Sequence, residues 1–140
     1  MLIRIFIHFF ILLHFTATPN APVQNNGRYL EAGIEDDHQF ERWFKKFQEF
    51  VGHENRDKIG DLIYYPVDVR INHKEVRIKN KREFLYRYSE MFTKEVKDII
   101  KNQTIRGLNV SDKGVMVGNG EVWINVIENK PGFWITAINN

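Results

Sequence analysis

Gly114-Val115-Met116-Val117-Gly118-Asn119-Gly120-Glu121-Val122-Trp123-Ile124 is the stretch of this sequence that most constrains the fold. Its apolar residues predict a single strand that continues to the end of the alternating pattern, over about Val115–Ile127. Glycines inside a strand pattern indicate a bulge. We therefore expect Gly118–Gly120 to bend this strand, and with it the sheet.

Strands are also predicted on both sides of this stretch. They cover about Thr104–Val110 and Phe133–Asn139, and turn-like segments join them to the central strand. Further upstream, apolar and polar residues alternate from Val67 to Ile71 and again from Val76 to Ile78. This alternation predicts a β-hairpin with one apolar face.

Helical periodicity precedes and follows that hairpin. A first helix is predicted from a cap at Asp36 or Asp37 to Gly52, with an aromatic stripe that we interpret as core: Phe40, Trp43, Phe44, Phe47 and Phe50. A second runs from a cap at Asn55 through Ile63 and ends before Pro66. A third begins after the cap residue Asn80, and Thr93 can cap a further turn or two.

The order of these elements predicts an α+β domain over residues 36–140. A curved antiparallel sheet of about five strands, packed against three or four helices, would bury every apolar stripe. Such a sheet leaves a cone-shaped gap between its concave face and the helices.

The order resembles the nuclear transport factor 2-like fold, also called the cystatin-like cone. The segment Gly114–Ile124, the ending Ile135–Asn139 and the helix segment Asn80–Thr93 resemble a group of small exported bacterial proteins of that fold whose role is uncharacterised. The resemblance spans about Phe40 to Asn140. It implies the cone but no activity, because this fold hosts isomerases, dehydratases, immunity proteins and binding modules.

The first residues have the order of a secretory signal. Arg4 is followed by an apolar run of 11 residues to Phe15 and then by small and polar residues, so we predict a signal peptide over residues 1–21. The run is shorter than the roughly 20 residues that span a bilayer. The alternatives are an uncleaved apolar anchor, the only membrane contact that we expect, and a misassigned start codon. Residues 22–35 are predicted to be a flexible lead-in, and the domain to be periplasmic or secreted.

Composition excludes several kinds of site. The chain has no cysteine, which excludes disulfides and thiolate chemistry, and its net charge of +2 argues against nucleic-acid binding. His38, His53 and His73 are far apart and have no metal-ligand spacing. We predict no metal, cofactor or catalytic residue, and the sequence leaves the oligomeric state open, a dimer included.

Five residues are candidates for ligand binding. Alternation places Glu121 and Trp123 on one face of the predicted strand, either the solvent side of the sheet or the cone interior, and the bulge would aim Asn119 inward. Tyr65 and Tyr88 offer hydroxyl groups near the expected mouth of the pocket. A solvated glutamate beside a half-exposed tryptophan is the alternative interpretation.

Three functions are compatible with these features. We expect an exported, non-enzymatic binding or interaction domain whose partner is a small hydrophobic ligand or a protein. An immunity-type inhibitor of a secreted toxin and a small isomerase- or dehydratase-like enzyme are the alternatives.

Overall fold

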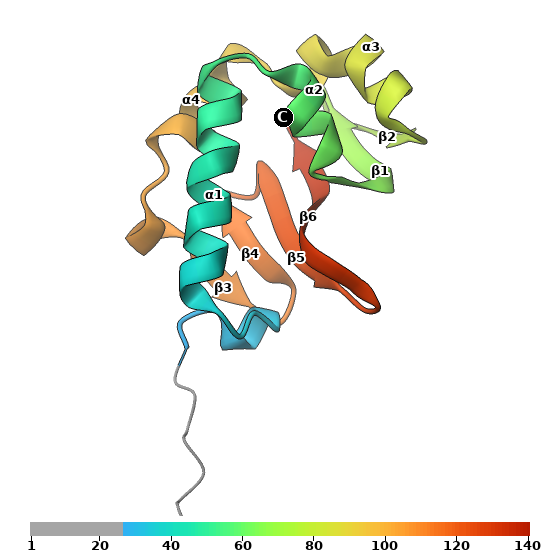
Figure 1. Ribbon diagram of the computed structural model, residues 1–140. Helices are drawn as coiled ribbons and strands as arrows, with labels where there is room; N and C mark the ends of the chain where they lie inside the picture. Colours follow the sequence, from blue (N-terminus) through green and yellow to red (C-terminus); the bar gives the residue numbers. More distant parts are fainter. Residues whose placement is uncertain (1–26) are drawn as a thin grey trace, which may run out of the picture.

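A computed structural model describes residues 27–140 of the chain (Figure 1). Each of its α-helices starts at a residue whose side chain caps the first turn. Side chains of the predicted cap residues accept a backbone hydrogen bond from the first turn in α1 (Asp37–Gly52), α2 (Arg56–Asp61), α3 (Lys81–Met91) and α4 (Lys94–Asn102). The caps are Asp36, Asn55, Asn80 and Thr93, as predicted. The predicted signal peptide and the start of the lead-in fall on residues 1–26, outside the described residues.

One six-stranded sheet forms the other layer of the α+β fold, with the order β2-β1-β6-β5-β4-β3 (Figure 1). Its strands are β1 (Ile63–Ile71), β2 (Lys74–Ile78), β3 (Asn109–Ser111), β4 (Gly114–Val117), β5 (Val122–Ile127) and β6 (Lys130–Asn139). The α+β class is confirmed. The prediction of a purely antiparallel sheet was wrong, because β1 and β6 pair in parallel at the centre. A parallel pair is possible there because two α-helices and four strands separate β1 from β6 along the chain.

The predicted central strand divides into β4 and β5, which accounts for the sixth strand. Val117 pairs with Val122, so the residues between them form a tight reversal and not a bulge. Gly118 has φ +64° and Gly120 has φ +114°, backbone angles that glycine adopts at little cost and that allow the chain to turn back. The glycines were correctly interpreted as a deviation from a regular strand, but they end the strand instead of bending it.

Two other boundaries differ from the prediction. A 3₁₀ turn, Ile105–Gly107, occupies most of the expected strand before β3, because the Thr104 hydroxyl accepts a hydrogen bond from the Gly107 amide at 3.1 Å. The second helix ends at Asp61, and Ile63 already belongs to β1. Both differences come from short segments in which apolar residues fit a helix and a strand equally well.

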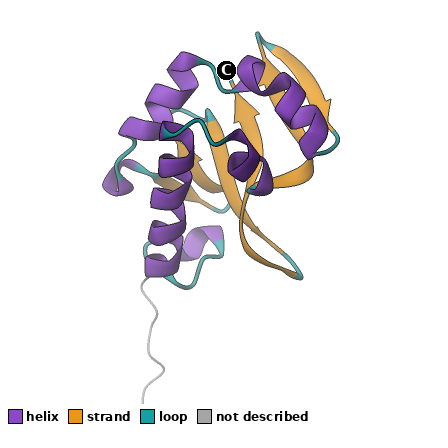
Figure 2. Cartoon of the chain, turned by 45° about the horizontal axis from the view of Figure 1, so that its top comes forward, coloured by secondary structure: helices purple, strands orange, loops and turns teal. Residues whose placement is uncertain are grey.

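Helices cover one face of the sheet (Figures 1 and 2), and apolar side chains fill the space between the two layers. The aromatic stripe of α1 is core, as predicted: the rings of Phe40 and Phe133 on β6 lie 5.2 Å apart and nearly perpendicular. Phe84, Tyr88 and Phe92 form a second aromatic group by α3. The space that the prediction left as a cone-shaped gap is therefore packed with large apolar side chains.

The opposite face of the sheet carries exposed and half-exposed side chains. One row of paired residues crosses all six strands: Arg77, Asp68, Ala137, Trp123, Met116 and Asn109. Trp123 therefore lies on the uncovered face, the first of the two positions that its alternation allowed.

The segment before α1 belongs to the domain, which corrects the prediction of a flexible lead-in for its described part, residues 27–35. Tyr29 is fully buried, and its ring lies 4.6 Å from that of Phe40. Arg28 donates hydrogen bonds to the carbonyl oxygens of Arg106 at 2.8 Å and Leu108 at 3.2 Å. The polar composition of the segment did not predict these contacts, because they are made with residues distant in the sequence.

Alkaline pH is expected to destabilise the fold from about pH 10 upward, where tyrosine normally ionises. Burial, followed by the charge of Glu41, raises the pKa of Tyr29 to about 12. Burial also raises the pKa of Tyr88 to about 12, assisted by Glu54 and opposed by Arg56. The folded state keeps protons that the unfolded chain releases, so this stabilisation is complete below the unfolded pKa and is lost as the pH rises through the folded pKa.

Urea unfolding between about pH 9 and pH 11.5 measures this loss as a falling free energy of unfolding. Tyr88→Phe should reduce the number of protons released on unfolding in this pH range by about one, and so make the free energy of unfolding fall less steeply with pH. At neutral pH the substitution should not destabilise the protein, because no hydrogen-bond partner of the Tyr88 hydroxyl lies within residues 27–140. An unchanged pH dependence in the variant would contradict the prediction.

Candidate functional site

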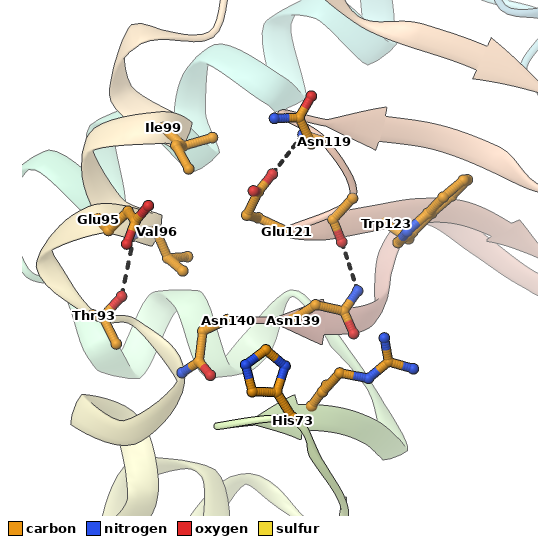
Figure 3. A pocket seen from close by; sticks show the side chains of 12 residues that line it. His73, Thr93, Glu95, Val96, Ile99, Asn119, Glu121, Trp123, Asn139 and Asn140 are labelled. Carbon is orange, nitrogen blue, oxygen red and sulfur yellow. Dashed lines mark hydrogen bonds between the residues drawn. The ribbon is translucent and has the colours of Figure 1, made fainter.

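A cavity of about 400 Å³ lies at the rim of the sheet, where α4 meets the β4–β5 turn and the ends of β1 and β6 (Figure 3). Its walls come from four separate parts of the chain: Arg70 and His73; Thr93, Glu95, Val96 and Ile99; Asn119, Gly120, Glu121 and Trp123; Asn139 and Asn140. It therefore lies beside the helix-covered core, not inside the predicted cone.

The β4–β5 turn positions the Glu121 carboxylate. The Asn119 amide donates a hydrogen bond to Glu121 Oε2 at 2.6 Å, and the Gly118 amide donates one to Gln103 Oε1 at 2.8 Å. A Cβ atom on Gly118 would lie 2.1 Å from Glu121 Oε2. Glycine at this position therefore supplies both the backbone angle and the space that the carboxylate occupies.

Two asparagines of the pocket wall hold the strand ends together. The Asn139 side chain donates a hydrogen bond to the Gly120 carbonyl at 2.6 Å, and the Asn139 backbone N–H donates one to the Glu121 carbonyl at 2.8 Å. Asn140 accepts a hydrogen bond from the Asn72 amide at 2.9 Å and donates one to the Glu90 carbonyl. Their contacts fix the β4–β5 turn and the β1–β2 turn on opposite sides of the cavity.

The remaining polar groups of the wall are largely unused by the protein. Among residues 27–140, the side chains of His73, Glu95 and Asn119 make no hydrogen bond or ion pair, and the Glu121 carboxylate uses only Oε2. Arg70 has one ionic partner, Glu75 at 3.5 Å, in a pair whose side chains are 52% and 82% exposed. Val96, Ile99 and Trp123 supply apolar surface between these groups.

The structure brings together three of the five candidate residues, Asn119, Glu121 and Trp123. Tyr65 and Tyr88 lie outside this cavity. The Tyr65 hydroxyl donates to the Gly60 carbonyl at 3.1 Å, and burial raises its pKa. Tyr88 is buried between Phe84 and Phe92, with the Arg56 guanidinium 4.7 Å from the centre of its ring.

Sequence reasoning missed Arg70, His73 and Glu95. Arg70 and His73 fall in the predicted β-hairpin, whose alternation marks only its apolar face, and Glu95 has no local signal at all. Asn72 and His73 have φ +49° and +63°, so the β1–β2 turn projects the imidazole toward the cavity (Figure 3). Only the packing of α4 against the strand ends makes these residues neighbours.

Within the described part of the chain, no three His, Asp or Glu side chains are grouped so that they could hold a metal ion. Across the same residues, none of the helices combines the length and apolar character needed to cross a membrane. Neither a protein-family model nor a curated protein matches the chain.

Proposed function

We propose that this is an exported, non-enzymatic binding domain that holds a small molecule in the cavity at the rim of the sheet. The observation that carries the proposal is the convergence of unused polar groups on a preformed cavity. Its volume of about 400 Å³ lies within the range of small-molecule sites. Export is the part of the proposal that rests on the pattern of residues 1–21.

The lining favours a ligand with polar groups over the hydrophobic ligand expected from the sequence. Carboxylates, a guanidinium, an imidazole and amide groups face the same space as Trp123 and Ile99. A purely apolar ligand would remove water from these groups without replacing its hydrogen bonds, which costs free energy.

Binding is favoured over proton-transfer catalysis by the exposure of the site. That chemistry needs a carboxyl group in a dry cavity beside a hydroxyl group. No charged side chain among residues 27–140 is buried, and Tyr65 and Tyr88, whose hydroxyl groups were expected near the pocket, lie outside the cavity.

A protein partner on the uncovered sheet face is the second candidate. Trp123 and Met116 are half-exposed on that face, and tryptophan is frequent at the centre of protein interfaces. This is the surface that an immunity-type inhibitor would use, and a partner there would cover Trp123 together with Arg77 and Asp68.

Glu121→Gln is expected to weaken small-molecule binding by about tenfold or more, since a hydrogen bond to a charged group contributes about 1.5–3 kcal/mol. A mixed library of small metabolites can be screened against the ¹⁵N-labelled exported chain, following the Trp123 indole and Gly120 amide signals. Glu128→Gln, on the exposed β5–β6 turn, is the matched control and should leave affinity unchanged.

A library that perturbs neither signal would refute the pocket, and perturbation by a protein partner alone would favour the sheet face. The mass of the protein isolated from its own cells shows whether residues 1–21 have been removed, and so tests export.

A further inference from the structure

The basic and the acidic side chains of the cavity lie on different sides. Arg70, at the end of β1, and His73, in the β1–β2 turn, approach from one side. Glu121, after the β4–β5 turn, and Glu95, in the first turn of α4, approach from the opposite side (Figure 3). The division follows from the architecture, because the two basic residues belong to one hairpin and the two acidic residues to other elements.

Neither side neutralises the other within the protein. The ion pair of Arg70 is with Glu75 on β2, which is not among the residues that line the cavity, and no ion pair joins Arg70 or His73 to Glu95 or Glu121. Glu121 is held by the Asn119 amide with Oε1 left over. Basic and acidic side chains from separate elements therefore face one cavity without forming an ion pair with each other.

Trp123 and Ile99 lie in the same cavity as these charges. The indole offers a flat apolar surface for the body of a ligand, and the Asn119 side chain offers both a donor and an acceptor. A ligand that matches these features has an anionic end, a cationic end and a short carbon framework between them.

We propose that the cavity binds a small zwitterion of the amino-acid or short-peptide class. The carboxylate lies toward Arg70 and His73, and the ammonium group lies toward Glu121 and Glu95. Guanidinium groups bind carboxylates through parallel hydrogen bonds, and a carboxylate pairs well with an ammonium group. This inference rests on the proposed function, because it names the ligand class of the same site.

A panel of free amino acids and dipeptides, each with its N-acetylated and its C-amidated derivative, tests the inference on the exported chain. Acetylation removes only the cation, and amidation removes only the anion. The best parent compound is expected to bind at least about tenfold more tightly than either derivative, measured by calorimetry and by the Trp123 indole signal.

Two variants assign the ends of the ligand. Arg70→Gln should weaken binding of the parent compound but not of its amidated derivative, which has no carboxylate. Glu121→Gln should weaken binding of the parent compound but not of its acetylated derivative, which has no ammonium group. Arg77→Gln is the control, because Arg77 pairs with Asp68 on the same sheet face outside the cavity.

The outcomes separate this inference from the function on which it rests. Neutral or singly charged compounds that bind as tightly as the parent compounds would overturn the zwitterion while leaving a small-molecule site intact. Zwitterions that leave the Trp123 signal unchanged, when other metabolites shift it, would overturn it in the same way. If no compound of any class shifts the signal, both the site and its ligand class are refuted.

Discussion

Replacing Tyr29 with alanine is expected to lower the free energy of unfolding by about 3–5 kcal/mol, the usual cost of deleting a buried aromatic side chain. Tyr29 is fully buried, its ring packs 4.6 Å from that of Phe40, and its hydroxyl lies 3.4 Å from Glu41 Oε1. Such a loss would show that the segment before α1 is part of the core. Urea unfolding followed by tryptophan fluorescence measures it.

Leu30→Ala is the matched control for this substitution. Leu30 is the next residue and begins the 3₁₀ turn Leu30–Ala32, but its side chain is 37% exposed, so its replacement should cost less than about 1 kcal/mol. A similar small cost for both variants would mean that residues 27–35 are peripheral, as the sequence suggested.

Gly114→Ala is expected to destabilise the protein by about 2–4 kcal/mol, from backbone strain combined with overpacking. Gly114 has φ +117° at the start of β4, an angle that residues with a Cβ rarely adopt. Its added Cβ would lie 2.7 Å from the backbone oxygen of Ile124 and 2.3 Å from Asn125 Oδ1. The backbone oxygen belongs to the β4–β5 pairing, so it can move only if that pairing is disturbed.

Gly52→Ala provides the comparison, measured by the same urea unfolding. Gly52 is the last residue of α1, and no atom lies within 4 Å of the position of its Cβ. Because alanine favours a helix more than glycine does, this variant should be neutral or more stable by up to about 1 kcal/mol. Equal effects at both positions would show that the contacts of Gly114 do not restrict its side chain.

The stability of the core and the proposed binding site are separate properties of this fold. The aromatic side chains fill the space between the helices and the sheet, so a ligand cannot use that space without displacing them. The cavity lies outside this core, and its polar groups belong to turns and to strand or helix ends. Substitutions such as Glu121→Gln and Arg70→Gln can therefore change binding while leaving the fold intact.

The candidate site was partly predictable because Asn119, Glu121 and Trp123 are local neighbours in the sequence. A polar residue beside two glycines and a tryptophan within a strand pattern indicates an irregular position, and the structure has one there, although it is a reversal and not the predicted bulge. Tyr65 and Tyr88 were included because hydroxyl groups were expected near the cone. Their actual neighbours, the Gly60 carbonyl and the aromatic group by α3, follow from packing.

The sequence by itself determined the features that depend on nearby residues: the helix caps at Asp36, Asn55, Asn80 and Thr93, the buried stripe of α1, the hairpin of β1 and β2, and the α+β class. Capping bonds span three residues and hydrophobic periods span a few more, so the local pattern carries them. Only the tertiary structure decided the parallel pairing of β1 with β6, the burial of Tyr29 and the meeting of Arg70 and His73 with Glu95 and Glu121. These contacts join segments far apart in the chain, and their free energy depends on the simultaneous packing of all the elements between them.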